Sequence, residues 1–247
     1  MVLRFWIRLI LPMVLSVGLA TAQSPAPTTF QSENKSVTIE RFDPKTAGSH
    51  PAVIVVHGGG GAQGDWRKSG LLEALTDAGY IAFVPHYFEG TGGNWTRSAN
   101  ADQLIAYIRT LNDAARFVAE QLGVQKDGIG LVGISLGSYV VLALTEEESS
   151  HPPPQPSPAI KAVVEMYGGM PEFAADRMTT MAPVLILHGQ DDNLIPVSNA
   201  LELEELLQKK SVPYEMKIYP HQGHGFDGDA LVDANQRAVA FLKAHLP

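Results

Sequence analysis

The sequence predicts an α/β fold built on a mostly parallel central sheet with helices on both faces. Short apolar runs alternate along the chain with longer segments of helical periodicity, and this alternation is typical of a parallel sheet. Residues 52–56 form a continuous run of alanine, valine and isoleucine, which indicates a strand buried on both faces. At 247 residues the chain is long enough for one large domain with a sizeable core.

The expected elements follow one another with short connections. Residues 36–42 alternate as an edge strand does, and residues 65–78 predict a helix that ends at Gly79. A long helix is expected over residues 98–122, because apolar residues spaced alternately four and three apart would line one of its faces. Those residues are Leu104, Ile108, Leu111, Ala115, Val118 and Leu122. Further strands are expected at 52–56, 80–85, 128–133, 160–167, 184–188 and 214–219, and further helices at 138–147, 197–210 and 229–246.

The first 22 residues have the pattern of a secretory signal peptide. Arg4 and Arg8 precede an apolar stretch, and Ala20-Thr21-Ala22 is a small-x-small cleavage site. We therefore expect a signal peptide at 1–22, a linker at 23–35 and one folded domain at 36–247. The expected location is the periplasm or the medium, with an uncleaved N-terminal anchor as the alternative.

Charge and cysteine content exclude several classes of function. The formal net charge is −8 and the sequence pI is near 5.4, which disfavours a nucleic-acid partner because phosphate binding needs a basic surface. The chain has no cysteine, so disulfides, thiol nucleophiles and cysteine metal sites are excluded.

A serine follows the strand expected at 128–133 in a pattern that points to nucleophilic catalysis. Gly133-Ile134-Ser135-Leu136-Gly137 lies between this strand and a helix, as in the Gly-x-Ser-x-Gly nucleophile elbow. Such a turn raises the serine hydroxyl above the sheet and directs the next amide, the N–H of Leu136, toward the same space. The alternative is an ordinary glycine-rich turn between a strand and a helix.

A serine hydroxyl needs a base to take its proton, and a histidine follows the last expected strand. His224 lies between Gly223 and Gly225, which let the loop turn the imidazole inward. His221 is the competing base. The two histidines could also bind a metal, but no third histidine or carboxylate cluster lies near them in the sequence.

The base in turn needs a carboxylate that fixes its tautomer. Asp191 and Asp192 follow the strand expected at 184–188, and the pattern His-Gly-x-x-Asp-x-x-Ile-Pro favours Asp192. Alternatively, both aspartates form an Asx turn that caps the helix expected from residue 197.

Four glycines follow the strand at 52–56 and suit an oxyanion hole. In His57-Gly58-Gly59-Gly60-Gly61 no side chain blocks the approach of a substrate oxygen, and we expect the N–H groups of Gly59 and Leu136 to stabilise the oxyanion. A phosphate-binding loop is the alternative, but the lysine and Ser/Thr of a P-loop are missing. His57 is expected to make a structural hydrogen bond.

These motifs together resemble the dienelactone hydrolase family of the α/β-hydrolase fold, over residues 36–246. The resemblance is carried by His57-Gly58-Gly59-Gly60-Gly61, Pro85-His86-Tyr87-Phe88, Gly133-Ile134-Ser135-Leu136-Gly137, the segment 188–196 and Gly223-His224-Gly225-Phe226. The order serine, aspartate, histidine is the one that this fold uses. The resemblance implies a compact sheet without a large lid domain and hydrolysis of small esters or lactones without a cofactor. The founding members use a cysteine nucleophile, and the serine here favours a broader carboxylesterase activity.

The sequence indicates the substrate only weakly. Trp66, Tyr87, Phe88 and Trp95 follow strand ends and are candidates for the wall of a substrate pocket, with packing beneath the loops as the alternative. Arg97 could meet a substrate carboxylate or be solvated at a helix start. The expected function is cleavage of small esters or lactones by Ser135, His224 and Asp192 through an acyl-enzyme. A peptidase, an acyltransferase and a non-catalytic binding protein are the alternatives.

Overall fold

The predicted fold class is confirmed by a computed structural model, which describes residues 27–91, 100–145 and 159–247. Within these ranges one sheet of eight strands has the order β1-β2-β4-β3-β5-β6-β7-β8. The pairs β1–β2 and β2–β4 are antiparallel and the other neighbours are parallel. The strands are β1 (Thr28–Ser32), β2 (Lys35–Phe42), β3 (His50–Val56), β4 (Ile81–Pro85), β5 (Val124–Ile134), β6 (Ile160–Met166), β7 (Val184–Gly189) and β8 (Tyr214–Tyr219). The signal peptide expected at 1–22, Trp95 and Arg97 lie outside the described residues.

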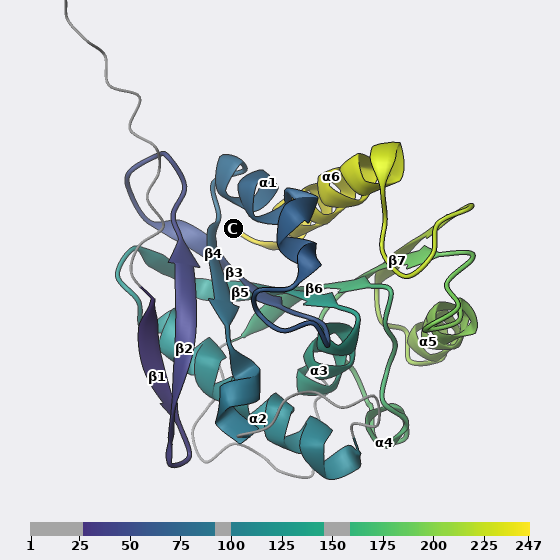
Figure 1. Cartoon of the computed structure of the whole chain (residues 1–247), viewed down its shortest axis with the longest axis horizontal. Coiled ribbons are helices and arrows are strands. Elements are labelled where there is room, and N and C mark those ends of the chain that lie inside the picture. Colours follow the sequence, from purple (N-terminus) through teal and green to yellow (C-terminus); the bar gives the residue numbers. More distant parts are fainter. Residues whose placement is uncertain (1–26, 92–99, 146–158) are drawn as a thin grey trace, which may run out of the picture.

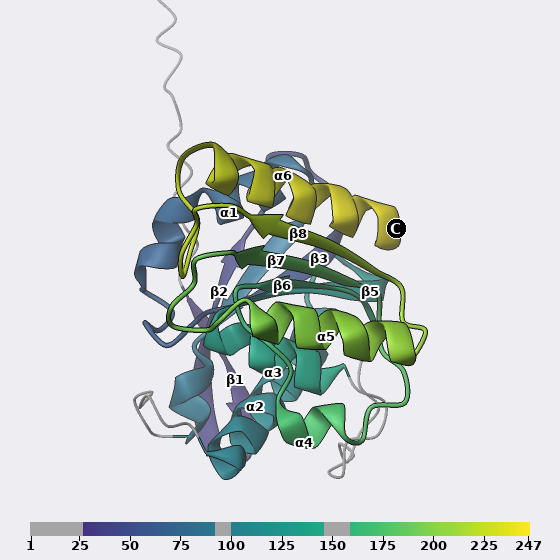
Figure 2. The same cartoon turned by 90° about the vertical axis from the view of Figure 1, so that its right-hand side faces the viewer.

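Helices cover both faces of the sheet, and Figures 1 and 2 show the three layers. α1 and α6 pack on one face, whereas α2, α3 and α5 pack on the other. The helices are η1 (Asp65–Ser69), α1 (Leu71–Asp77), η2 (Tyr87–Thr91), α2 (Ala101–Ala119), α3 (Leu136–Leu144), α4 (Glu172–Ala175), α5 (Ser198–Lys209) and α6 (Gly228–His245). No lid domain occurs in the described part of the chain, and none of its helices is long and apolar enough to span a bilayer.

The core lies between the sheet and each helical layer. In β3, Ile54 and Val56 pack toward α2 and α3, whereas Val53 and Val55 pack toward α1 and α6. A strand that packs on both faces needs apolar residues at every position, which explains the uninterrupted β-branched run in the sequence. The parallel strands β5, β7 and β8 end at the same edge of the sheet, so the loops that follow them meet there.

The N-terminal strand corrects two expectations. Thr28–Ser32 form β1, so the linker expected over 23–35 is shorter, and β1 replaces residues 36–42 as the edge of the sheet. A two-residue turn joins β1 to β2, and Phe30 is buried with its ring 5.8 Å from that of Phe117. One aromatic residue among polar neighbours is too weak a pattern to predict a strand.

Two helices differ from their expected ranges. The helix expected over 65–78 is interrupted at Gly70, whose φ of 74° is left-handed, so that a 3-10 turn precedes α1. The helix expected over 98–122 is described from its cap at Asn100 and ends at Ala119. Leu122, expected on its apolar face, is therefore 90% exposed, because the helical register is lost before that residue.

Candidate active site

The turn between β5 and α3 holds Ser135 in a strained conformation. Its φ of 55° and ψ of −116° lie outside the regions that a residue with a side chain prefers. The Ser135 N–H donates to the carbonyl of Met166 at 2.9 Å, which ties the turn to the end of β6. Backbone strain of this kind persists where surrounding contacts enforce it, and it is common at functional sites.

Two glycines allow the close packing that enforces the turn. A Cβ atom on Gly137 would lie 2.0 Å from the carbonyl oxygen of Val56, and one on Gly133 would lie 2.6 Å from the Cα of Ser138. Neither position has space for any other residue. The glycines two before and two after Ser135 are therefore required by contact between helix α3 and the strands beneath it.

The structure brings the three predicted residues together in one chain of contacts. Ser135 Oγ lies 2.8 Å from His224 Nε2, and His224 Nδ1 lies 2.8 Å from Asp192 Oδ2. With Nδ1–H donating to the carboxylate, Nε2 is free to accept the serine proton. The arrangement can therefore deprotonate Ser135 and stabilise the resulting imidazolium.

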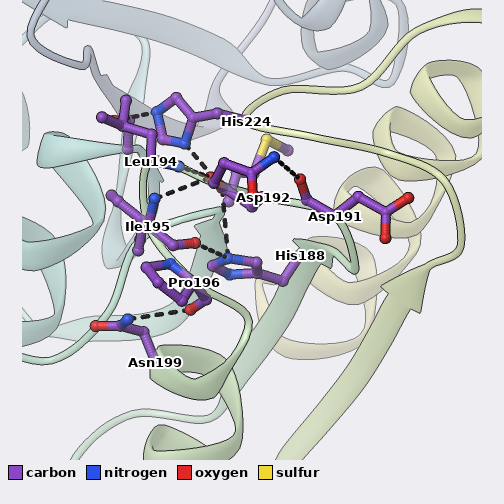
Figure 3. A network of polar contacts seen from close by, with 12 residues as sticks. His188, Asp191, Asp192, Leu194, Ile195, Pro196, Asn199 and His224 are labelled. Carbon is purple, nitrogen blue, oxygen red and sulfur yellow. Dashed lines mark hydrogen bonds and ion pairs between the residues drawn. The ribbon is translucent and has the colours of Figure 1, made fainter.

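Asp192 has a second task in the same loop, which Figure 3 shows. Its Oδ1 accepts the N–H groups of Leu194 at 2.8 Å and Ile195 at 2.9 Å, so the buried carboxylate also forms the Asx turn before α5. The contact with His224 and the Asx turn, both weighed from the sequence, thus involve the same residue. His188 lies beneath it, with Nε2 2.9 Å from the Ile195 carbonyl, and burial lowers the pKa of its imidazole.

The competing residues lie elsewhere on the surface. The nearest oxygen of Asp191 is 3.7 Å from His221 Nδ1, and their side chains are 59% and 95% exposed. In Figure 3 the carboxylate of Asp191 points away from His224. Neither Asp191 nor His221 is in contact with Ser135.

The glycine loop after β3 passes directly beside the serine. A Cβ atom on Gly58 would lie 3.1 Å from the Cβ of Ser135, so a larger residue would crowd the hydroxyl. The two predicted oxyanion donors, Gly59 and Leu136, both line the cavity that contains Ser135. Leu136 is the first residue of α3, so its N–H has no carbonyl to bond within the helix.

A cavity of about 860 Å³ opens around Ser135, and its wall is largely apolar. Trp66 lines it, as the sequence predicts, and its indole N–H donates to the Gly61 carbonyl at 3.1 Å. Sequence reasoning missed most of the other large side chains in the wall. These are Leu104, Tyr139, Tyr167, Leu194, Ile195, Phe226 and Leu231. They come from loops and helix ends on both sides of the sheet, where no periodic pattern marks them.

Tyr87 and Phe88 do not line this cavity, which corrects the prediction that they do. Tyr87 is fully buried; its hydroxyl donates to the His57 carbonyl at 2.8 Å and its ring stacks on that imidazole at 4.3 Å. Phe88 packs edge-on against the same imidazole. Burial lowers the pKa of His57 to about 4, so it is neutral and structural. The aromatic residues that follow β4 therefore pack beneath the glycine loop and support it.

The described residues contain no cluster of three or more histidine, aspartate or glutamate side chains that could hold a metal ion. The polar residues that line the cavity include Ser135 and His224, and also Asp65, Lys68 and Ser69 of helix η1.

Comparisons with known proteins identify the family and the fold. Residues 40–244 match the sequence model of the dienelactone hydrolase family. A carboxymethylenebutenolidase homolog of Xenopus tropicalis is 27% identical over 183 residues, which cover 70% of this chain and 69% of the relative. Dipeptidyl aminopeptidase BIII of Pseudoxanthomonas mexicana is 23% identical, over 74% of this chain and 31% of the relative. Dienelactone hydrolase of Anabaena variabilis superposes with a TM-score of 0.71 at 17% identity, covering 91% of this chain and 99% of that one.

Proposed function

We propose that this chain, which belongs to the dienelactone hydrolase family, is a serine hydrolase that cleaves small carboxylic esters or lactones with apolar groups. The observation that carries the proposal is the 2.8 Å contact between Ser135 Oγ and His224 Nε2, at a serine held in a strained turn. Backbone strain is common at functional sites, and a base within hydrogen-bond distance can activate a serine hydroxyl.

In the first half of the reaction Ser135 Oγ attacks the substrate carbonyl carbon while His224 Nε2 takes its proton. The carbonyl oxygen becomes an oxyanion, which the N–H groups of Gly59 and Leu136 stabilise. Asp192 stabilises the imidazolium. When the intermediate collapses, the bond to the leaving oxygen breaks and His224 gives its proton to that oxygen. For an ester an alcohol departs, and for a lactone the new hydroxyl stays on the acyl group.

In the second half water attacks the acyl-enzyme. His224 takes a proton from the water, and a second oxyanion forms at the same two amides. Its collapse returns the proton to Ser135 Oγ and releases a carboxylic acid. Because one base serves both halves, loss of the contact between His224 and Asp192 should slow both steps.

The cavity wall supports a substrate with apolar groups. Its volume of about 860 Å³ is within the range of small-molecule sites, and the rings of Trp66, Tyr139, Tyr167 and Phe226 line it. A panel of p-nitrophenyl esters of acetic, butyric and phenylacetic acid should show kcat/KM rising with the size of the acyl group. An aromatic lactone tests ring opening.

The decisive variant is Ser135→Ala. It should lose p-nitrophenyl acetate hydrolysis and labelling by a fluorophosphonate probe, while its thermal unfolding stays cooperative. Ser198→Ala is the matched control, since Ser198 is exposed at the start of α5. Undiminished turnover by the Ser135→Ala protein would contradict the proposal.

A second candidate function is peptide hydrolysis, which the similarity to a dipeptidyl aminopeptidase favours. The same serine chemistry would then act on an amide with a poorer leaving group. Matched ester and amide substrates of one dipeptide separate the two, since an esterase should cleave only the ester at a useful rate. An added alcohol acceptor that captures the acyl group would instead indicate an acyltransferase.

We also propose that the protein is exported, because residues 1–22 have the pattern of a signal peptide. Sequencing of the N-terminus of the protein made in a bacterial host tests this, with cleavage after Ala22 as the expected result.

A further inference from the structure

A glutamate that the proposed reaction does not use lies beneath the nucleophile. Glu165 is the sixth residue of β6, fully buried, and it stands directly opposite Gly133 of the Ser135 turn. Burying a carboxyl group costs free energy unless other groups compensate, so its presence in the core needs an explanation.

The Glu165 carboxyl is bound on one side only. The Gly168 N–H donates to its Oε1, whereas the Ser138 hydroxyl donates to the carbonyls of Gly133 and Met166. Among the described residues, Oε2 has no hydrogen-bond partner. Burial raises the pKa of this group to about 8, so it is a neutral acid at neutral pH.

The bond from Gly168 closes a turn over residues 165–168 that supports the nucleophile. Within this turn the Met166 carbonyl accepts the N–H of Ser135 at 2.9 Å. A Cβ atom on Gly168 would lie 2.7 Å from the Ser135 carbonyl oxygen and 2.3 Å from the Cβ of Ser138. The turn therefore packs without spare room against the backbone of the nucleophile and the first turn of α3.

The same turn supports the base. Closing it leaves Tyr167 with a φ of 43°, which is unusual for a residue with a bulky side chain. The Tyr167 ring packs edge-on against the imidazole of His224, with ring centres 5.1 Å apart. It packs in the same way against Phe226, two residues further along that loop. The turn over residues 165–168 thus contacts both Ser135 and His224, the two residues that share the hydrogen bond.

We infer that Glu165 is a positioning residue, whose carboxyl holds the 165–168 turn so that Ser135 and His224 keep their mutual geometry. The inference rests on the proposed function, because positioning matters only if these two residues react. The carboxyl acts through Gly168 and Tyr167 and does not touch the substrate.

The titratable groups around Glu165 argue that its neutral form is the active one. Asp192 lies on the neighbouring loop, Tyr139 on α3 and Tyr167 in the turn itself. The charge of Asp192 disfavours a negative charge on Glu165. Ionised Glu165 would also oppose the negative charge that develops on the oxyanion beside Ser135.

The test compares Glu165→Gln, Glu165→Leu and the wild type by kcat and KM for p-nitrophenyl butyrate between pH 6 and pH 10. Glutamine keeps an oxygen for the Gly168 N–H and cannot ionise, whereas leucine has a similar volume and no acceptor. We expect kcat of the leucine variant to fall about 30-fold or more with KM changed less than about threefold, because a misplaced catalytic group affects the chemical step. The glutamine variant should keep kcat within about threefold at pH 7, since its hydrogen bond is retained.

The pH profile gives the second measurement and does not depend on the folding of the leucine variant. In the wild type kcat should decline above pH about 8 as Glu165 ionises. The glutamine variant should lack this decline, and Glu205→Gln, at an exposed position of α5, should retain it.

Three results would overturn the inference. They are a folded leucine variant with wild-type kcat, a glutamine variant as impaired as a folded leucine variant, or identical pH profiles for the glutamine variant and the wild type. If Ser135→Ala keeps full activity, the proposed function fails and the inference fails with it. If the Ser135→Ala protein is inactive but the folded Glu165 variants behave as the wild type does, the proposed function stands and the role of Glu165 is refuted.

Discussion

Replacing Glu165 by glutamine should change how the free energy of unfolding depends on pH. In the folded protein burial raises the pKa of Glu165 from 4.5 to about 8, whereas in the unfolded chain the group titrates near its ordinary value. Between pH 4.5 and about pH 8, Glu165 is protonated in the folded protein and ionised in the unfolded chain. The stability that this proton contributes is complete below pH 4.5 and is lost as the pH rises through 8.

The size of the effect follows from the difference between the pKa of Glu165 in the folded protein and its pKa in the unfolded chain. Each pH unit between them costs the wild type about 1.4 kcal/mol, or roughly 5 kcal/mol over the whole interval. Glutamine has no proton to lose, so the difference in unfolding free energy between variant and wild type should rise by that amount from pH 4 to pH 9. Other groups titrate equally in both proteins and cancel.

Urea denaturation of both proteins at one-unit steps from pH 4 to pH 9 measures the difference directly. Glu205→Gln is the control, because this exposed side chain should change stability by the same small amount at every pH. A difference between the Glu165→Gln protein and the wild type that stays constant within about 1 kcal/mol would show that Glu165 is already ionised in the folded state, and would refute the reasoning.

Three further predictions concern the candidate active site. Asp192→Asn should lower kcat for p-nitrophenyl acetate by about 10³-fold or more, because the amide favours the wrong tautomer of the imidazole; a loss under tenfold would contradict this. Gly137→Ala should lower the free energy of unfolding by about 2 kcal/mol or more, since its Cβ would lie 2.0 Å from the Val56 carbonyl oxygen. Gly60→Ala is the control in thermal melts, as its Cβ would meet nothing nearer than 3.7 Å. Trp66→Ala should raise KM for the phenylacetate ester about tenfold, while Trp66→Phe changes it little; equal KM values would place the acyl group elsewhere.

Much of the candidate site could be predicted from the sequence because local spacing encodes it. The strained turn at Ser135 requires small residues at fixed offsets, so Gly133 and Gly137 identify it within five positions. The support beneath that turn could not be predicted. Glu165 looks like one polar residue near the end of an apolar strand, and only the pairing of β5 with β6 brings it opposite Gly133.

The elements of the fold, too, could be predicted where a local sequence pattern determines them, and could not where contacts with distant residues do. The central strands could be predicted because burial on both faces demands an unbroken apolar run. β1 could not, since its single buried ring, Phe30, packs against Phe117 from a helix more than eighty residues later in the chain. The position of Tyr87 after a strand end predicts a place in the pocket, but the side chain is buried beneath the glycine loop. The local sequence does not indicate on which side of the loop such a residue lies.

The position of α6 has a consequence for how the chain reaches its native state. Leu242 of this helix packs on the face of the sheet that also carries Val53, Val132 and Val164, and a Cβ on Gly130 would lie 2.7 Å from its side chain. While the chain is being synthesised, the part of this apolar face that α6 covers stays exposed until α6 has been made. His224 also arrives late, so a nascent or truncated chain carries the serine without its base. The segment from His224 through α6 thus ends a period of aggregation risk and brings the imidazole to Ser135.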